Sequence, residues 1–313
     1  MDRIALFGAS GAIGDSIAAT LRSQDRPYRV VGRKRAELEA KFGSDTGAEI
    51  VTWNPDDKES VRAAARGIDT IFYLVGVPYW RFELHPVLMR KTLEGAIAEG
   101  VQRLVLIGTV YPFGRPRTPL VREDHPREPH TFKGRMRKEQ EDAVLEADAA
   151  GRIRTAILRL PDFYGPDVEK SFLANAFRAA LKDRRAQLIG PIDTRHEFIY
   201  VPDVGPVAVA LAGEPHSFGR TWNLAGPGAI TQRALVERIF QETGYEPRFR
   251  VANKTMLRVL GLFSPLMREL VEMHYLFKTP VIMDDSAIHR LLTKIKKTPY
   301  EEGIRETLRR MKA

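Results

Sequence analysis

The chain has 313 residues, 43% of them hydrophobic and 28% charged, proportions that are ordinary for a globular protein. It contains no cysteine, which excludes disulfide bonds, thiolate metal sites and cysteine nucleophiles. The formal net charge of +9 suits an anionic ligand, but the cations are spread along the chain among acids, so we expect no nucleic-acid partner.

The first two-thirds of the chain alternate short apolar runs with helical patterns, which is typical of a parallel sheet covered by helices. We therefore expect an α/β fold with a doubly wound parallel sheet, known as a Rossmann fold. The apolar runs predict strands at 4–7, 28–31, 49–53, 70–75, 103–107 and 154–160. The helical patterns predict helices at 15–22, 35–42, 58–66, 87–99 and 135–149.

After Pro166 the pattern becomes mostly helical and less regular, with late strands at 197–201 and 221–224. This change predicts one domain over 1–165, with a returning strand segment near 197–225, and a smaller, mainly helical domain over 166–313.

One apolar stretch in the second part, between residues 257 and 270, allows several interpretations. It could roof a hydrophobic cleft, support a dimer or belong to the core, and core is the default.

No stretch of the chain reaches the roughly 18 uncharged apolar residues of a membrane span, and no signal peptide is visible. We expect a cytoplasmic protein with no membrane partner. No histidine pair at helical spacing and no carboxylate cluster suggests a metal site, so none is predicted.

A glycine-rich turn joins the first predicted strand to the first helix. It reads Gly8-Ala9-Ser10-Gly11-Ala12-Ile13-Gly14. Gly8 permits a tight turn, Gly11 lets the backbone approach a pyrophosphate, and Gly14 lets helix and strand pack closely. The helix N-terminus adds free N–H groups and the positive end of its dipole. The turn therefore predicts a dinucleotide-binding first domain.

The end of the second predicted strand indicates which dinucleotide is bound. An acid is expected there if the ligand is the ribose 2′-hydroxyl. Instead, Gly32 is followed by the cations Arg33, Lys34 and Arg35. These favour a 2′-phosphate, and hence NADP(H) over NAD(H), with Arg33 as the main clamp.

Several motifs together resemble the short-chain dehydrogenase/reductase superfamily, and within it the extended branch of NAD-dependent epimerase/dehydratase proteins. They are the GxxGxxG spacing of the turn and the stretches 67–74, 158–166, 197–204 and 222–226. The resemblance implies further cofactor contacts. These are Asn54 and Pro55 beside the adenine, Val75 and Gly76 after the fourth strand, and Leu160, Pro161 and Phe163 beside the nicotinamide.

The family's chemistry normally needs Tyr-x-x-x-Lys on the helix after the fifth strand, where the lysine and tyrosine act together in proton transfer. No tyrosine of this chain is followed by lysine four residues later. Lys133 stands in the tyrosine's place and Arg137 in the lysine's. Thr109, at the end of the fifth strand, could replace the family's third catalytic group.

Three hypotheses follow for the proton transfer. Lys133 could carry it, made acidic by Arg137 and by burial. Tyr111 could reach the same space from the loop, with His125 and His130 as less favoured alternatives. The acid–base chemistry could also be gone, leaving a binding fold. In each case Arg137 can contact ribose or phosphate of the cofactor as a cation.

These expectations define two functions. The first is an NADP(H)-binding oxidoreductase or epimerase/dehydratase-like enzyme acting on a small carbonyl or hydroxyl compound, with a sugar-derived compound as one option. The second is a non-catalytic NADP(H)-binding redox sensor or regulatory protein. The resemblance also makes a homodimer an option, because dimers are common in the family.

Overall fold

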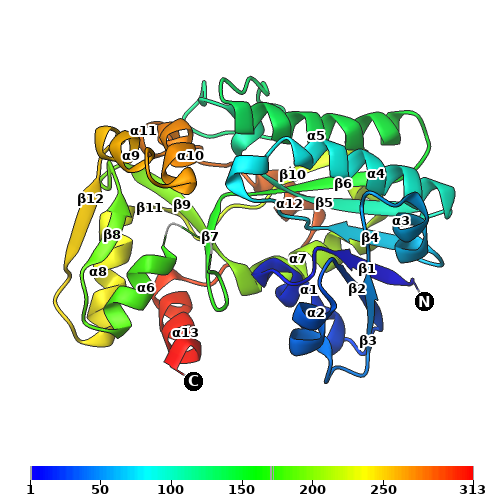
Figure 1. The fold of residues 1–313 in the computed structure, drawn as a ribbon, viewed down its shortest axis with the longest axis horizontal. Helices are drawn as coiled ribbons and strands as arrows, with labels where there is room; N and C mark the ends of the chain where they lie inside the picture. The colour runs from blue at the N-terminus through cyan, green and yellow to red at the C-terminus, as the bar shows by residue number, and fades with distance from the viewer. Residues whose placement is uncertain (1, 170, 172, 313) are drawn as a thin grey trace.

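A seven-stranded parallel sheet forms the centre of the larger part of the molecule, on the right in Figure 1. The computed structural model describes residues 2–169, 171 and 173–312. The strands lie in the order β10-β6-β5-β4-β1-β2-β3. Their bounds are β1 (Ile4–Phe7), β2 (Tyr28–Gly32), β3 (Ala48–Thr52), β4 (Thr70–Tyr73), β5 (Arg103–Thr109), β6 (Arg154–Leu160) and β10 (Arg220–Asn223). The chain order reverses between β1 and β4, and ligands of such sheets bind outside the carboxyl ends of the strands at that point.

Helices cover both faces of this sheet (Figure 1). One face carries α1 (Ala12–Ser23), α2 (Arg35–Phe42) and α7 (Val201–Gly213), and the other carries α3 (Lys58–Ala65), α4 (Leu84–Ala98) and α5 (Phe132–Ala149). Successive strand residues point to opposite faces, so Leu6 packs in the core with α1 while Phe7 packs in the core with α3. Because both faces are buried, the central strands are apolar almost throughout.

The C-terminal part of the chain has a core of its own. Three helices, α6 (Ala174–Leu181), α8 (Gln232–Thr243) and α13 (Tyr300–Lys312), pack there against a small sheet of β7 (Asp162–Tyr164), β9 (Arg195–Tyr200) and β11 (Ala229–Thr231). A second pair, β8 (Ala186–Ile189) and β12 (Phe249–Ala252), adjoins it. The remaining helices are α9 (Lys254–Leu260), α10 (Pro265–Met273), α11 (Tyr275–Lys278) and α12 (Ser286–Leu291), with 3-10 turns η1 (Tyr79–Arg81), η2 (Tyr111–Phe113) and η3 (Pro215–Ser217).

The expected doubly wound sheet is confirmed. The late strand near 197–201 is β9, which belongs to the small sheet, whereas β10 pairs with β6 at the edge of the main sheet. The helix expected at 135–149 begins at Phe132, because the hydroxyl of Thr131 accepts a hydrogen bond from the Gly134 N–H at 3.1 Å and caps it. Lys133 therefore lies in the first helical turn. The division of the chain at residue 165 stays a prediction.

The apolar stretch between residues 257 and 270 is not ordinary core, and that default interpretation is wrong for most of it. Leu257 and Leu270 are buried, whereas Val259, Leu262 and Phe263 are exposed. The stretch forms two short helices, α9 and α10, which pack on the rest of the chain by one face only.

Candidate active site

The glycine-rich turn has the geometry of a phosphate-binding loop. A Cβ on Gly8, whose φ is +89°, would lie 2.8 Å from the backbone of Val75, so only glycine lets the ends of β1 and β4 meet so closely. A Cβ on Gly14 would lie 2.3 Å from the carbonyl oxygen of Ala9. Among the described residues, a Cβ at Gly11 would meet no atom within 4 Å, and no side chain caps the start of α1. An open helix N-terminus of this kind fits a pyrophosphate.

The other predicted cofactor contacts lie along the carboxyl ends of the strands of the main sheet. Ser10, Ala12 and Ile13 belong to the turn; Arg33 and Lys34 follow β2; Asn54 and Pro55 follow β3; Val75 and Gly76 follow β4; Thr109 ends β5; Leu160 and Pro161 stand at the end of β6; and Phe163 lies in β7. The space beside Gly76 is open as well, because a Cβ there would meet no atom of the residues that the structure describes within 4 Å. The structure therefore gathers the predicted residues at one edge of the sheet.

The three cations after β2 differ in their partners. Lys34, just before α2, donates to Glu37 at 2.5 Å, and Arg35 donates to Glu39 at 2.7 Å within α2. Arg33 is exposed and has no ion pair among the residues that the structure describes. Of the three cations, Arg33 is therefore the one that can bind a ligand without breaking an ion pair that the structure describes.

Lys133 is completely buried, and its ammonium is held by two carboxylates. Its Nζ donates to Glu269 and, at 2.8 Å, to Oε2 of Glu272. Its backbone N–H donates to Oε1 of Glu272 at 3.1 Å, so the same carboxylate also binds the N-terminal turn of α5. Two carboxylates therefore occupy the space around the Lys133 ammonium. The Lys133 proton-transfer hypothesis remains a prediction with little support from the geometry.

Arg137 lies one helical turn further along α5 and points into the protein. Its guanidinium contacts Nδ1 of His85 at 3.2 Å and donates to the carbonyl oxygen of Ile107 at 3.3 Å. Burial and the adjacent cation lower the pKa of His85 well below its usual value, so the ring is neutral and its Nδ1 can accept. Burial also lowers the pKa of Arg137, although a guanidinium keeps its charge in proteins. The predicted role of Arg137 at the ribose or phosphate is not tested by these contacts.

Tyr111, which is buried, and Tyr79, which is half-buried, form a pair of phenols just beyond the end of β5. Their hydroxyl oxygens lie 2.6 Å apart, and the ring of Phe82 stacks on Tyr111 at 6.3 Å between centroids. Burial, and then the neighbouring Tyr79 and Asp162, raise the pKa of Tyr111 well above its usual value. Burial raises the pKa of Tyr79 as well. Both phenols are therefore protonated at neutral pH and can donate a proton to a reacting oxygen.

The remaining predicted residues near this pair take supporting positions. The hydroxyl of Thr109 accepts a hydrogen bond from the N–H of Tyr111 at 3.3 Å and so helps to fix the turn that carries the phenol. His130 lies edge-on to the ring of Tyr275, with 4.5 Å between centroids. His125 instead accepts from the N–H of Arg117 at 3.0 Å within its own loop.

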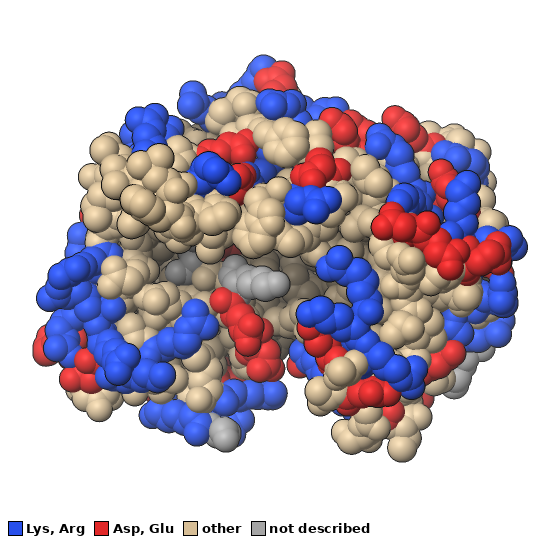
Figure 2. Space-filling model, viewed as in Figure 1, with Lys and Arg blue, Asp and Glu red and all other residues tan. Residues whose placement is uncertain are grey.

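A carboxylate–imidazole pair beside these phenols was not among the predicted catalytic groups. Asp162 follows Leu160 and Pro161, and its Oδ2 lies 2.6 Å from Nε2 of His196 on β9. His196 is 9% exposed, and its Nδ1 has no hydrogen-bond partner among the described residues. The two residues are 34 positions apart, so only the pairing of β7 with β9 brings them together. Figure 2 shows that the molecule is hollowed between the sheet and the C-terminal part.

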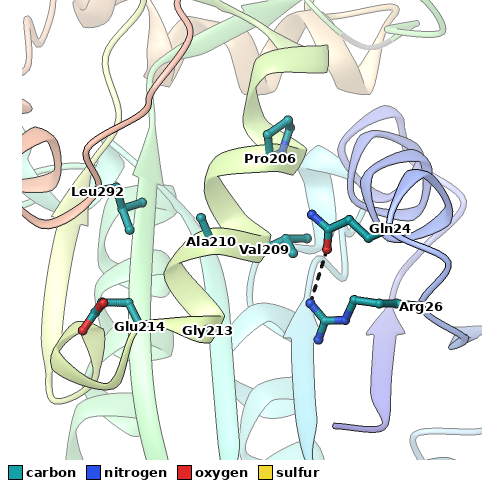
Figure 3. A pocket seen from close by; sticks show the side chains of 8 residues that line it. All are labelled: Gln24, Arg26, Pro206, Val209, Ala210, Gly213, Glu214 and Leu292. Carbon is teal, nitrogen blue, oxygen red and sulfur yellow. Dashed lines mark hydrogen bonds between the residues drawn. The ribbon is translucent and has the colours of Figure 1, made fainter. Parts of the chain in front are cut away.

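A separate cavity of about 390 Å³ lies on the opposite edge of the sheet (Figure 3). It is bounded by the end of α1, including Gln24, by the second half of α7, and by Arg26, Glu214 and Leu292. None of the predicted cofactor or catalytic residues lines it. The candidate active site is therefore the carboxyl edge described above. Within the described ranges, no group of three or more His, Asp or Glu residues could hold a metal ion.

The fold and the glycine-rich turn define a dinucleotide-binding α/β protein. The model of the NAD dependent epimerase/dehydratase family matches residues 4–225, and the chain belongs to this family, which is a family of enzymes.

Two curated relatives match most of the chain. One is a dTDP-6-deoxy-L-talose 4-dehydrogenase (NAD(P)(+)) of Kitasatospora kifunensis, 28% identical over 77% of this chain and 79% of the relative. The other is a (4-alkanoyl-5-oxo-2,5-dihydrofuran-3-yl)methyl phosphate reductase of Streptomyces griseus subsp. griseus, 26% identical over 79% of this chain and 76% of the relative.

Solved structures match the whole fold at low identity. A dTDP-glucose 4,6-dehydratase from Streptomyces venezuelae with bound NAD gives a TM-score of 0.82 at 18% identity, covering 99% of this chain and 97% of that one. A UDP-glucuronic acid 4-epimerase from Bacillus cereus in complex with NAD gives 0.80 at 16% identity, covering 99% and 98%. At these identities the likeness concerns the fold alone.

Proposed function

We propose that the protein is an NADP(H)-dependent oxidoreductase that interconverts a carbonyl and a hydroxyl group on a small, sugar-derived compound. The observation that carries the cofactor preference is Arg33, the exposed cation after β2 without an ion pair among the described residues. An unpaired guanidinium matches the geometry of a phosphate group, and no acid stands where a ribose 2′-hydroxyl would need one. The K. kifunensis relative, whose name includes NAD(P)(+), supports a nicotinamide cofactor of either kind.

We propose Tyr111 as the proton donor for carbonyl reduction. The cofactor, when bound, supplies the hydride. The phenol of Tyr111 is protonated, lies at the end of β5 and shares a short hydrogen bond with Tyr79. When Tyr111 gives its proton to the developing alkoxide, Tyr79 can donate to the resulting phenolate and stabilise it. Lys133, enclosed by its two carboxylates, would hold α10 against the site rather than exchange protons with substrate.

The two predicted domains would have different roles, one in binding the cofactor and the other in binding the substrate. Residues 1–165 would hold the cofactor, with β10 completing the sheet, and residues 166–313 would supply the substrate side of the hollow. His196 from the second part meets Asp162 from the first, which makes this pair the natural place for a substrate hydroxyl or carbonyl.

The replacement of the family's tyrosine by an ion-paired lysine also favours a second candidate, a protein that binds NADP(H) without turnover. Oxidation of NADPH in the presence of a panel of sugar-derived ketones, aldehydes and lactones separates the two. The enzyme proposal expects at least one compound to accelerate NADPH oxidation. Saturable NADPH binding with no turnover on any compound would support the second candidate instead.

A further inference from the structure

The helices α9 and α10 present an unusual concentration of exposed apolar side chains. Six of the thirteen large exposed hydrophobic residues in the described part of the chain fall between residues 256 and 266. They are Met256, Val259, Leu260, Leu262, Phe263 and Leu266, and we name them the α9–α10 patch. Leu262 and Phe263, in the turn between the helices, are 79% and 86% exposed. Such a cluster marks an interaction surface, since isolated exposed hydrophobic residues are the norm.

The turn that carries Leu262 and Phe263 has a defined shape. The side chain of Asn253 accepts from the Met256 N–H at 2.9 Å at the start of α9, and Ser264 caps the start of α10. A Cβ on Gly261 would lie 3.0 Å from the Cα of Arg268, so the two helices pack closely at the turn. The inward-facing Leu257 is fully buried and anchors α9 to the protein. The packed helices therefore fix the turn between them so that Leu262 and Phe263 face solvent.

The exposed charged residues of α9 and α10 are cations. Lys254, Arg258 and Arg268 are exposed and stand on the two helices, and the sequence contains no Asp or Glu from residue 247 to residue 268. The next acids, Glu269 and Glu272, are partly buried and pair with Lys133, and Oε1 of Glu269 also lies 4.0 Å from Nε of Arg268. In Figure 2 the corner of the molecule that holds α9 and α10 carries a broad uncharged area, with cations around it and acids along one side.

We propose that the α9–α10 patch docks on an anionic lipid membrane surface, with Leu262 and Phe263 entering the boundary between headgroups and acyl chains. Exposed apolar residues bordered mainly by lysine and arginine are what an anionic interface binds. A symmetric contact with a second copy would bring three cations from each chain together, which like-charge repulsion opposes. No helix in the described residues is long and apolar enough to cross a bilayer, so the contact is peripheral. This departs from the sequence-based expectation of no membrane partner, which considered spanning segments.

The position of the patch connects the membrane to the site. The helix α10 carries Leu266 outward and Glu269 and Glu272 inward to Lys133, at the start of α5. Docking would thus place the hollow next to the lipid surface, where a substrate with an apolar portion is concentrated.

Co-sedimentation of the full chain with vesicles tests this proposal. One set contains phosphatidylcholine alone and the other a mixture with phosphatidylglycerol. The wild type should bind the mixed vesicles, and added salt should weaken this binding. The double variant Leu262→Ser, Phe263→Ser should lower the affinity at least about tenfold, because both apolar side chains are lost. The variant Lys254→Glu, Arg258→Glu should lose the preference for the anionic vesicles.

The matched control is Leu120→Ser, which removes an exposed leucine outside the patch and should bind like the wild type. Circular dichroism melting of each variant checks that the fold is retained. The variant Lys254→Glu, Arg258→Glu tests the proposal independently of the apolar variant, because it leaves Leu262 and Phe263 in place. Wild-type protein that binds neither vesicle overturns the proposal. So does a wild-type dimer, by light scattering, that the Leu262→Ser, Phe263→Ser variant converts to monomer, since the patch would then join two copies.

Discussion

Oε2 of Glu272 lies 2.8 Å from Nζ of Lys133, which fixes α10 of the C-terminal part to the first turn of α5. The contact joins residues 139 positions apart in the sequence. It lies where the resemblance to the family leads us to expect a catalytic tyrosine, so an ion-paired lysine stands in the expected place of a phenol.

Because Lys133 is buried and held in this ion pair, we expect removal of the two carboxylates to lower the free energy of unfolding substantially. The variant Glu269→Gln, Glu272→Gln leaves a completely buried ammonium without a charged partner, and we expect a loss of at least about 3 kcal/mol in the free energy of unfolding, measured by urea denaturation. As a control, Glu37→Gln breaks the exposed pair with Lys34 and should cost no more than about 1 kcal/mol. Equal, small losses in both variants would show that Lys133 does not depend on its carboxylates.

The glycine-rich turn predicts opposite outcomes for two alanine substitutions. Gly11→Ala adds a Cβ to open space, so it should cost less than about 1 kcal/mol of stability. It should nevertheless weaken NADPH binding at least about tenfold, because the methyl group occupies the approach of the pyrophosphate. Gly14→Ala forces a Cβ against the Ala9 carbonyl and should cost about 1–3 kcal/mol. Calorimetric melting and fluorescence titration measure the two quantities, and unchanged NADPH affinity in Gly11→Ala would contradict the assignment of the loop.

The proton-donor proposal predicts a selective loss of turnover. Tyr111→Phe removes the hydroxyl and should lower kcat by about 100-fold or more, while the Kd for NADPH stays unchanged. Tyr245→Phe, at an exposed position, serves as the control and should leave kcat unaltered. Full activity in Tyr111→Phe, together with loss of activity in a folded Lys133→Met variant, would transfer the role to Lys133.

The buried carboxyl of Glu197 predicts a pH dependence of stability. Burial raises the pKa of Glu197 to about 8, and its Oε2 accepts from the Met283 N–H at 3.2 Å. Because its pKa is higher in the folded than in the unfolded chain, the folded state binds more protons between the two values. Stability should therefore fall as the pH rises from about 5 to about 8.

Glu197→Gln, which cannot ionise, isolates this effect. Its free energy of unfolding relative to the wild type should rise by up to about 1.4 kcal/mol per pH unit over that window. A difference that stays constant with pH would mean that Glu197 does not titrate as described.

Much of the fold could be predicted from the sequence because the central strands are buried on both faces and read as continuous apolar runs. The turn at Gly8, Gly11 and Gly14 could be predicted too, because its function depends on local backbone geometry. Contacts between segments far apart in the chain could not be predicted from the sequence, and Lys133 is the clearest example. Its position in the motif was evident, whereas its partners Glu269 and Glu272 come from a helix whose placement no local pattern encodes.

For the same reason, neither the Asp162–His196 pair nor the α9–α10 patch could be predicted from the sequence. Asp162 was part of a recognised stretch, but its neighbour depends on which strand pairs with β7. The spacing of the apolar residues between 256 and 270 is compatible with helices. It does not show which side of each helix faces solvent, because both helices are short and carry apolar residues on several sides.

The most direct test of the central claim is the pair of dissociation constants for NADPH and NADH, measured by isothermal titration calorimetry on wild type and on Arg33→Ala. We expect the wild type to bind NADPH more tightly, and Arg33→Ala to raise the Kd for NADPH about 10- to 100-fold while the Kd for NADH changes by less than about threefold. Lys41→Ala, which removes an ion-paired cation of α2, controls for general loss of charge. Equal losses for the two cofactors, or tighter wild-type binding of NADH, would contradict the account.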